Sequence, residues 1–356
     1  MTFDTCVDCR EREASVNIRN RRLCAACFIR YVTSKVLKRM ESYRIKNMPE
    51  DQKCRLFLPV SGGISSLVLL QILDGQLQRQ VANRNRTAYD IVVARVVLPG
   101  EEAQQTITRQ SEDLKTRFPT HTFLPLLELH DVLRLDSKIS HDLEYLGIAR
   151  DEDESDRELF DRLISSTTSN TARADLQSIL LRRLLVATAK REGCEGILWG
   201  HSDTRLAALA LADVAKGRGG SVSSTIADGS SMHGINFSYP LRELYESELR
   251  LYGHATSEPV LVQAADHTTP VQPQASIRAT SIDDLLSTYI TSQGEKYPSI
   301  MANVVRTASK LEVRRPDGTI AACRVCVMPM TGRLGGQTTT SDLCYGCQRM
   351  RQDIKT

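Results

Sequence analysis

Apolar and polar positions along this chain separate short strand-like runs from longer helical stretches. Strand-length apolar runs occur at residues 55–60, 89–98, 122–127 and 196–199. Stretches of helical length or periodicity follow them, at residues 65–73, 101–117, 170–191 and 204–216. Strands that alternate with helices of this length predict a parallel, doubly wound α/β sheet.

Two segments interrupt this alternation. Residues 136–162 form a polar, acidic insertion, and residues 217–235 are rich in Gly and Ser, which favours a flexible loop. Carboxylates in such polar stretches usually face water. We therefore expect solvated positions for Asp131, Asp136 and Asp142.

Ten cysteines are the feature of the composition that changes this picture. Eight of them form two quartets with paired Cys-x2-Cys spacing, at Cys6, Cys9, Cys24 and Cys27 and at Cys323, Cys326, Cys344 and Cys347. Four thiolates suit a tetrahedral metal ion, so the spacing predicts two structural zinc sites, with iron–sulfur ligation as the alternative. A closed four-thiolate site has no open position, so it implies no catalysis by the metal.

These patterns divide the chain into four parts. Residues 1–50 hold the N-terminal zinc module and an amphipathic helix expected to begin at its second cysteine pair, and residues 51–256 hold the α/β domain. The Pro-, Gln- and Ser-containing residues 257–280 are expected to form a linker. Residues 281–356 hold a helical segment and the C-terminal zinc module.

Composition excludes several classes of protein. No stretch approaches the run of about 18 apolar residues that a transmembrane helix needs. The first ten residues contain two acids and no apolar run, so we expect no secretory signal. A cytoplasmic location follows, where thiols stay reduced and disulfides are rare.

Positive charge gathers at the two ends of the chain. Residues 1–55 carry 13 Lys and Arg against 7 Asp and Glu, and residues 311–356 carry 7 against 4. The whole chain has a net charge of only +3, so its centre is mildly acidic. Basic ends are typical of a protein that binds a polyanion, although random surface variation gives the same count.

A glycine turn, Ser61-Gly62-Gly63, connects the first strand of the α/β domain to its helix. Backbone N–H groups at such a junction form an anion cradle, and ligands bind at the carboxyl ends of parallel strands. No Gly-Lys-Ser/Thr follows, so this is not a Walker A loop, and a plain tight turn is the alternative. The candidate phosphate-binding residues here are Ser61, Gly62, Gly63, Ser65 and Ser66.

A second turn, Gly200-His201-Ser202-Asp203, ends a later strand at the same edge of the predicted sheet. His201 is therefore a further candidate for the phosphate site. The alternative is a helix-capping turn with Asp203 as the N-cap residue.

These features together resemble the cytoplasmic tRNA 2-thiolation proteins, which are PP-loop proteins of the adenine-nucleotide α-hydrolase-like fold. The resemblance covers nearly the whole chain and implies a PP-loop domain between two zinc modules. Of the family's two paralogous subunits, the sequence is similar to the non-catalytic one. The segments that carry this similarity are Ser281–Leu285, Tyr297–Ile300 and Val304–Thr307.

The chain departs from the catalytic members of this family at the sulfur-handling positions. When the paired Arg182 and Arg183 are aligned with theirs, Asp175 and Ser178 stand where those enzymes carry Cys-x2-Cys. The family's later catalytic cysteine falls near residues 255–262, which contain none. The resemblance therefore implies a chain that does no sulfur chemistry itself.

The expected metal carboxylates are missing as well. Active PP-loop enzymes carry Asp at the position of Ser65, and an acidic pair at the positions of Thr204 and Arg205. Zinc at two structural sites is therefore the expected cofactor, and binding of ATP and Mg²⁺ is left open.

The resemblance also implies a function. This chain would be a subunit of the cytosolic complex that 2-thiolates wobble uridine 34 of tRNA Lys, Glu and Gln (mcm5s2U). Its partners would be the catalytic paralogue in a heterodimer, tRNA, and a thiocarboxylated ubiquitin-like sulfur carrier, which links the family to protein urmylation. The candidate tRNA contacts are Arg19, Arg21, Arg22, Lys35, Lys38 and Arg39.

Two other functions stay open. The chain could itself be an active ATP-dependent tRNA sulfurtransferase that uses Cys54 or Cys194, although a lone cysteine beside a strand favours a core position. It could also be a zinc-ribbon interaction scaffold without a nucleotide site.

Overall fold

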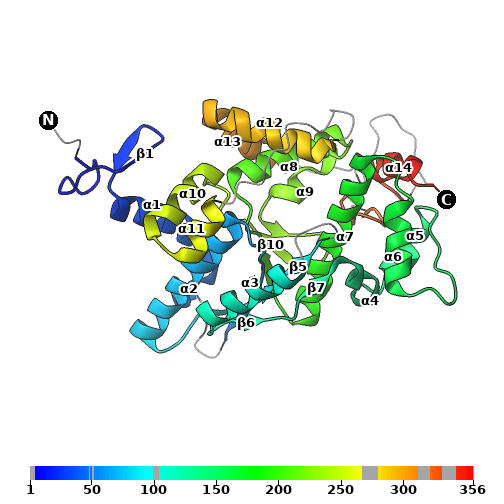
Figure 1. Ribbon diagram of the computed structural model, residues 1–356, viewed down its shortest axis with the longest axis horizontal. Helices are drawn as coiled ribbons and strands as arrows, with labels where there is room; N and C mark the ends of the chain where they lie inside the picture. The colour runs from blue at the N-terminus through cyan, green and yellow to red at the C-terminus, as the bar shows by residue number, and fades with distance from the viewer. Residues whose placement is uncertain are drawn as a thin grey trace.

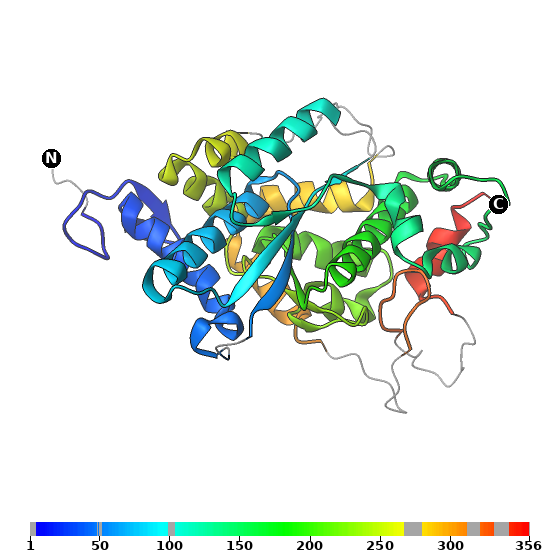
Figure 2. The same ribbon diagram turned by 90° about the horizontal axis from the view of Figure 1, so that it is seen from below.

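A mostly parallel sheet lies at the centre of the molecule (Figure 2). It has six strands in the order β6-β4-β3-β8-β10-β9. Every neighbouring pair is parallel except β10 and β9, which are antiparallel. The parallel doubly wound α/β sheet expected from the sequence is therefore confirmed. The strands are β3 (Cys54–Pro59), β4 (Tyr89–Ala94), β6 (Thr122–Phe123), β8 (Gly196–Leu198), β9 (Gly229–Ser230) and β10 (Asn236–Ser238).

The computed structural model describes residues 5–47, 49, 52–98, 104–266, 280–311, 321–330 and 342–355. The N-terminal module lies at one end of an elongated molecule and helix α14 (Tyr345–Gln352) at the other, with the α/β domain between them (Figure 1). Within the described residues, no helix is both long and apolar enough to cross a membrane.

Helices cover both faces of the sheet, which is why the centre of β3, Leu56–Leu58, is a continuous buried apolar run. Leu56 and Leu58 of β3 pack into one hydrophobic cluster, and Phe57 between them packs into the other. Successive residues of a strand point to opposite faces, so a strand buried on both sides needs apolar residues at every position.

One face of the sheet is covered by helices from both halves of the α/β domain and from the N-terminal module. These helices are α1 (Ala25–Arg39), α2 (Ile64–Arg84), α3 (Gln104–Arg117), α10 (Glu246–Thr256) and α11 (Pro259–Asp266). Helix α11 occupies the first part of the segment expected to be a linker and packs on α2 and α10. The rest of that segment, residues 267–279, lies outside the described residues.

The opposite face is covered by α7 (Asn170–Arg191) and α8 (Asp203–Ala215). Helices α12 (Ile282–Lys296) and α13 (Pro298–Ala308) pack against α8, so the helical segment after the expected linker joins the α/β domain (Figure 1). The C-terminal module packs into the same cluster.

The shorter elements refine the expected pattern. Arg95 splits the expected strand at residues 89–98 into β4 and β5 (Val96–Val97), and β5 pairs with β7 (Leu127–Glu128). The Gly- and Ser-rich segment is not one flexible loop, because it contains a 3-10 turn, η4 (Gly219–Ser221), and α9 (Ser223–Ile226), which bury Val222 and Ile226. The other elements are β1 (Val16–Ile18), β2 (Arg21–Leu23), η1 (Glu41–Tyr43), η2 (Ile45–Asn47), η3 (Leu129–Asp131), α4 (Val132–Leu135), α5 (Ile139–Glu144) and α6 (Asp156–Ser165).

Candidate functional site

The first cysteine quartet comes together around one point at the N-terminal end of the molecule. The Sγ atoms of Cys6, Cys9, Cys24 and Cys27 all lie within 4.8 Å of one another. The first pair lies in a turn held by a hydrogen bond of 2.8 Å from Cys6 N to Arg12 O, and the second pair enters helix α1, with Cys24 at the N-cap. Backbone N–H groups near Cys9 lower the pKa of the Cys6 thiol to about 6, which favours the thiolate that a metal requires.

The second quartet has the same construction at the other end. The Sγ atoms of Cys323, Cys326, Cys344 and Cys347 also lie within 4.8 Å of one another, and Cys344 is the N-cap residue of α14. Four sulfur donors at these distances fit a tetrahedral zinc ion, so both predicted sites are assembled. Such an ion would cross-link the turn and the helix, and four thiolate ligands would leave no open position for a substrate.

Most of the basic residues expected to contact tRNA are engaged in ion pairs. Arg19 makes two contacts of 2.8 Å with the buried Glu248 of α10 and stacks over Tyr245, with 4.2 Å between its Cζ and the ring centroid. Lys35 lies 3.3 Å from Glu243. Arg21 pairs with Asp8, and Arg39 pairs with Asp228. Lys38 and Arg22 are exposed on the same module.

These ion pairs show that the N-terminal module is docked on the α/β domain. Arg19 and Glu248 are 229 residues apart in sequence, and Lys35 and Glu243 are 208 apart. The basic residues therefore attach the module to the acidic start of α10 as well as giving it positive charge.

The glycine turn precedes helix α2, as expected. Gly62 has φ of +86°, a conformation that a side chain would strain, and Gly63 is the extended N-cap residue. The Ser66 hydroxyl donates to the Gly63 carbonyl at 2.9 Å, and the Gly63 N–H donates to Ser61 Oγ at 3.3 Å. The loop thus offers backbone N–H groups at the start of a 21-residue helix.

The second turn lies directly against this loop. A Cβ atom added to Gly200 would lie 2.9 Å from the Cα of Ser66, so the two turns meet at the carboxyl ends of β3 and β8. The strand order reverses between these neighbouring strands, which is where ligands bind in open α/β sheets. The structure therefore brings together the two turns that the sequence placed at one edge.

His201 sits in an apolar part of this site. Its ring lies between Trp199 and Tyr239, with centroids 5.5 and 5.9 Å away, and desolvation lowers its pKa to about 3. A neutral imidazole adds no positive charge for a phosphate. The turn does cap α8, as the alternative had it, but the cap residue is Ser202 and not Asp203: Ser202 Oγ accepts from Arg205 N at 3.2 Å.

The two turns fit a phosphate group better than they fit a magnesium ion. The side chain of Arg95 reaches the loop, since a Cβ atom on Gly62 would lie 3.0 Å from its Nη2. Ser65, Thr204 and Arg205 supply no carboxylate, and Thr204 Oγ1 instead accepts from Glu246 N at 3.2 Å. Mg²⁺ prefers carboxylate ligands, so these positions do not fit the ion that ATP carries.

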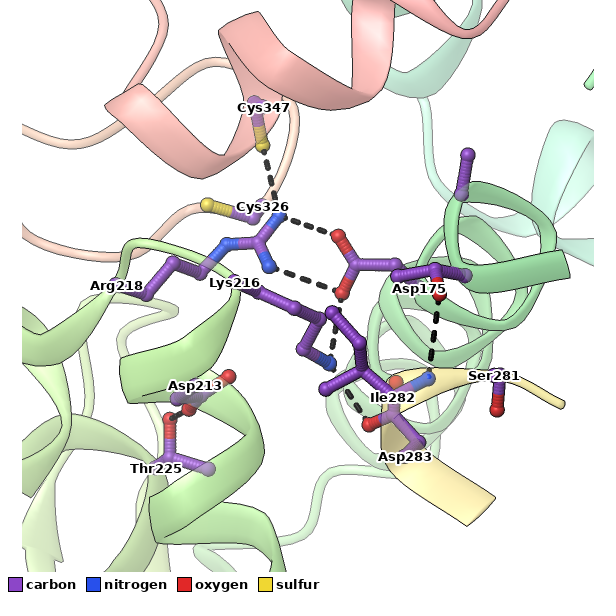
Figure 3. Close-up of polar contacts among 12 residues, drawn as sticks. Asp175, Asp213, Lys216, Arg218, Thr225, Ser281, Ile282, Asp283, Cys326 and Cys347 are labelled. Atoms are coloured by element: carbon purple, nitrogen blue, oxygen red, sulfur yellow. Dashed lines mark hydrogen bonds and ion pairs between the residues drawn. The ribbon is translucent and has the colours of Figure 1, made fainter. Parts of the chain in front are cut away.

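At the sulfur-handling positions implied by the resemblance, the structure has a buried charge network (Figure 3). The Asp175 carboxylate accepts two hydrogen bonds from Arg218, at 2.9 and 2.7 Å, and lies 3.0 Å from Lys216 Nζ. Lys216 also contacts Asp283 of α12 at 2.8 Å. Asp175 and Ser178 line a small cavity together with Cys326 of the C-terminal module.

The neighbouring Arg183 joins the same module to the acidic insertion. Its guanidinium contacts Asp136 at 2.6 Å and Asp142 at 2.7 Å, and donates to the carbonyls of Arg324 and Val325. The expected solvated positions are therefore wrong for Asp142, which is 5% exposed, and for Asp136, because a buried arginine needs carboxylate partners. Asp131 accepts from Glu128 N and ends the turn η3.

Sequence reasoning did not identify Lys216, Arg218 and Asp283 as members of this network, although Asp283 lies in the similar segment Ser281–Leu285. The sequence features that could have indicated close packing around these residues were Gly217 and Gly346. A Cβ on Gly217 would lie 2.4 Å from the Tyr345 ring, and one on Gly346 would lie 2.8 Å from Arg218.

The two cysteines outside the quartets are core residues. Cys54 and Cys194 are 3% and 8% exposed. Desolvation raises the pKa of Cys54 to about 12 and that of Cys194 to about 11, so neither is a thiolate at neutral pH.

Comparison with known proteins agrees with this architecture. The family described as cytoplasmic tRNA 2-thiolation protein 2 matches residues 281–340. Proteins of that name are similar to the chain along its length: one from Neosartorya fischeri is 39% identical, covering 99% of this chain and 98% of its own, and one from Coccidioides immitis is 40% identical with the same coverage.

A solved structure shares the fold. The U34-tRNA thiolase NcsA from Methanococcus maripaludis, solved with its [4Fe-4S] cluster, superposes with a TM-score of 0.58 at 15% identity, covering 91% of this chain and 90% of NcsA. The identity over the full length of the curated relatives, more than the likeness of fold, decides the assignment: this chain belongs to the cytoplasmic tRNA 2-thiolation protein 2 family.

Proposed function

We propose that this chain is the non-catalytic subunit of a cytoplasmic complex that 2-thiolates wobble uridine 34 of tRNA Lys, Glu and Gln. Family membership gives it a role in tRNA 2-thiolation. The catalytic paralogue would be its partner in a heterodimer, and a thiocarboxylated ubiquitin-like protein would supply the sulfur.

The ion pair between Asp175 and Arg218 carries the non-catalytic part of this proposal. Thiolation requires a sulfur nucleophile, which is a thiolate or a cluster ligated by thiolates. Asp175 stands at a sulfur-handling position of the family, and its carboxylate is committed to Arg218 and Lys216. NcsA was solved with a [4Fe-4S] cluster. This chain has no cysteines for one beyond the two quartets and the protonated Cys54 and Cys194.

The test of this proposal is thiolation by reconstituted proteins. The chain alone, the paralogue alone and the two together receive tRNA, ATP, Mg²⁺ and the thiocarboxylated carrier, and nucleoside mass spectrometry measures 2-thiouridine. We expect product in quantity only from the pair. Thiolation by the chain alone would establish the active sulfurtransferase instead, and full activity of the paralogue alone would leave only a scaffold role.

The tRNA contact is proposed for the exposed basic face of the N-terminal module. Arg21, Arg22 and Lys38 are exposed on this face. Arg19 is held by Glu248. Lys38→Ala should weaken tRNA binding and reduce its dependence on salt, because each phosphate contact releases counterions. The matched control is Lys115→Ala, which removes an exposed lysine of α3. It should leave the tRNA affinity and its salt dependence unchanged. A tRNA affinity that does not vary with salt would contradict this contact.

A further inference from the structure

The two cysteine quartets have equal spacing within their pairs but different surroundings. In the N-terminal quartet, the pair that enters the helix reads Cys24-Ala-Ala-Cys27, and in the C-terminal quartet it reads Cys344-Tyr-Gly-Cys347. Ala26 is exposed to solvent, whereas the corresponding Gly346 is buried. Another part of the protein therefore covers the C-terminal site at Gly346, whereas the N-terminal site faces water at the corresponding Ala26.

That neighbour is Arg218, which comes from the segment after α8. Its Nη2 lies 3.5 Å from Cys347 Sγ while its guanidinium is held by Asp175 (Figure 3). Gly346 makes this approach possible, because a Cβ there would lie 2.8 Å from Arg218 Cγ and 2.9 Å from Nε. The fit is reciprocal: Gly217, at φ +83°, leaves room for the ring of Tyr345.

The contact between Arg218 and Cys347 would offset the negative charge of a metal–thiolate site. Four thiolates around a divalent cation carry a net charge of −2, which is costly to bury without a compensating cation. Hydrogen bonds to metal ligands orient the ligands and tune the metal, and losing one typically costs about 10- to 100-fold in affinity. Arg218 supplies such a donor in a site where three of the four cysteines are buried.

The N-terminal quartet obtains its donor locally. Arg30, three residues after Cys27 on the same helix, donates to Cys27 Sγ at 3.1 Å and is itself exposed. Water can replace an exposed donor of this kind, whereas it cannot reach one buried beneath α14.

We propose that Arg218, admitted by Gly346 and oriented by Asp175, is a positioning residue of the C-terminal metal site. Metal retention in that quartet then depends on the α/β domain, whereas the N-terminal quartet holds its ion by itself. The C-terminal ion thereby locks α14 onto α7 and α8 through the Asp175–Arg218 pair.

The experiment measures Zn²⁺ release from the full-length chain. Native mass spectrometry counts bound ions, and a colorimetric chelator measures the release rates. A Cys9→Ser background removes the N-terminal ion, so the remaining release belongs to the C-terminal quartet. In that background, Arg218→Met should speed release by about 10- to 100-fold. In the same way, Gly346→Ala should speed release by displacing Arg218 while all four thiols of the quartet remain.

The matched control is Arg351→Met, which changes an exposed arginine of α14 in the same Cys9→Ser background and should leave release from the C-terminal quartet unchanged. Arg218→Met keeps Asp175 paired with Lys216, so the domain should still fold, and circular dichroism checks this. If Arg218→Met fails to fold, the rate of Zn²⁺ release from Gly346→Ala tests the proposal in its place. Release at the parent rate from a folded Arg218→Met or from Gly346→Ala would overturn the proposal.

Discussion

Asp175 and Arg218 form a two-point ion pair, 43 residues apart in sequence, with each residue only 5% exposed. The pair connects α7 to the segment that touches the C-terminal cysteines. Asp175, where the resemblance to the catalytic family members places a sulfur-handling cysteine, is thus a structural contact in this chain.

Asp175→Asn should destabilise the protein by about 3 kcal/mol, because it leaves Arg218 buried without a full counter-charge. The double variant Asp175→Leu/Arg218→Met should lose less than the single variant, since Arg218 is then no longer left buried without its carboxylate partner. Denaturant unfolding in zinc-saturated buffer, followed by the fluorescence of Trp199, the only tryptophan, measures both. Equal losses in the single and double variants would show that the ion pair is not the cause.

Cys54→Ala and Cys194→Ala should leave thiolation by the reconstituted pair unchanged. Both thiols are buried and protonated at neutral pH, so neither can act as a nucleophile. Each substitution should cost about 1–2 kcal/mol of stability through lost packing. The measurement is the rate of 2-thiouridine formation per folded protein. A tenfold loss of this rate in either variant would support the alternative that the chain is itself a sulfurtransferase using that cysteine.

Asp203 should make the protein less stable as the pH rises. Burial raises the pKa of this carboxyl to about 7 from an ordinary value of 3.8, so the folded state holds the proton more tightly than the unfolded state. Below pH 3.8 the Asp203 carboxyl does not lower the free energy of unfolding. Between pH 3.8 and 7 it lowers this free energy progressively, and above pH 7 the loss stays constant.

Asp203→Asn should therefore raise stability at pH 8 by about 1–3 kcal/mol and have little effect near pH 4. Melting temperatures at pH 5 and pH 8 measure this difference, and Asp161→Asn, on the exposed side of α6, is the control. A wild type and an Asp203→Asn variant with the same pH dependence would contradict the assignment.

Gly200→Ala should destabilise the protein by about 1–3 kcal/mol, because the added Cβ would lie 2.9 Å from the Cα of Ser66 and push the two turns apart. Gly75→Ala is the matched control. It lies inside α2 with nothing within 4 Å of the added atom, and should stabilise by about 0.5–1 kcal/mol. Unfolding free energies of the two variants should thus change in opposite directions, and a stable Gly200→Ala would show that the turns are not in close contact.

Much of the fold could be predicted because its signals are local. The apolar run ending at Pro59, the glycine turn and the helix after it occupy consecutive residues, and the structure has β3, the turn and α2 there. The cysteine quartets were equally accessible, since a two-residue gap already places both sulfurs of a pair on one side of a turn.

The partners of charged residues were not accessible in the same way. Asp142 lies in an acidic stretch that reads as solvated surface, but it is buried against Arg183. Arg19 reads as a tRNA contact, but it is bound to Glu248, 229 residues away. A charged side chain can be buried only where the fold places an opposite charge beside it, and that partner is often distant in sequence.

The sequence by itself determined the strand–helix alternation and the two cysteine quartets. These follow from residue type and spacing along the chain. Only the tertiary structure decided that Asp175, Arg218 and Cys347 meet, because they come from α7, the segment after α8 and α14. Contacts among such distant segments depend on how the helices pack on the sheet, and no spacing within the sequence encodes that packing.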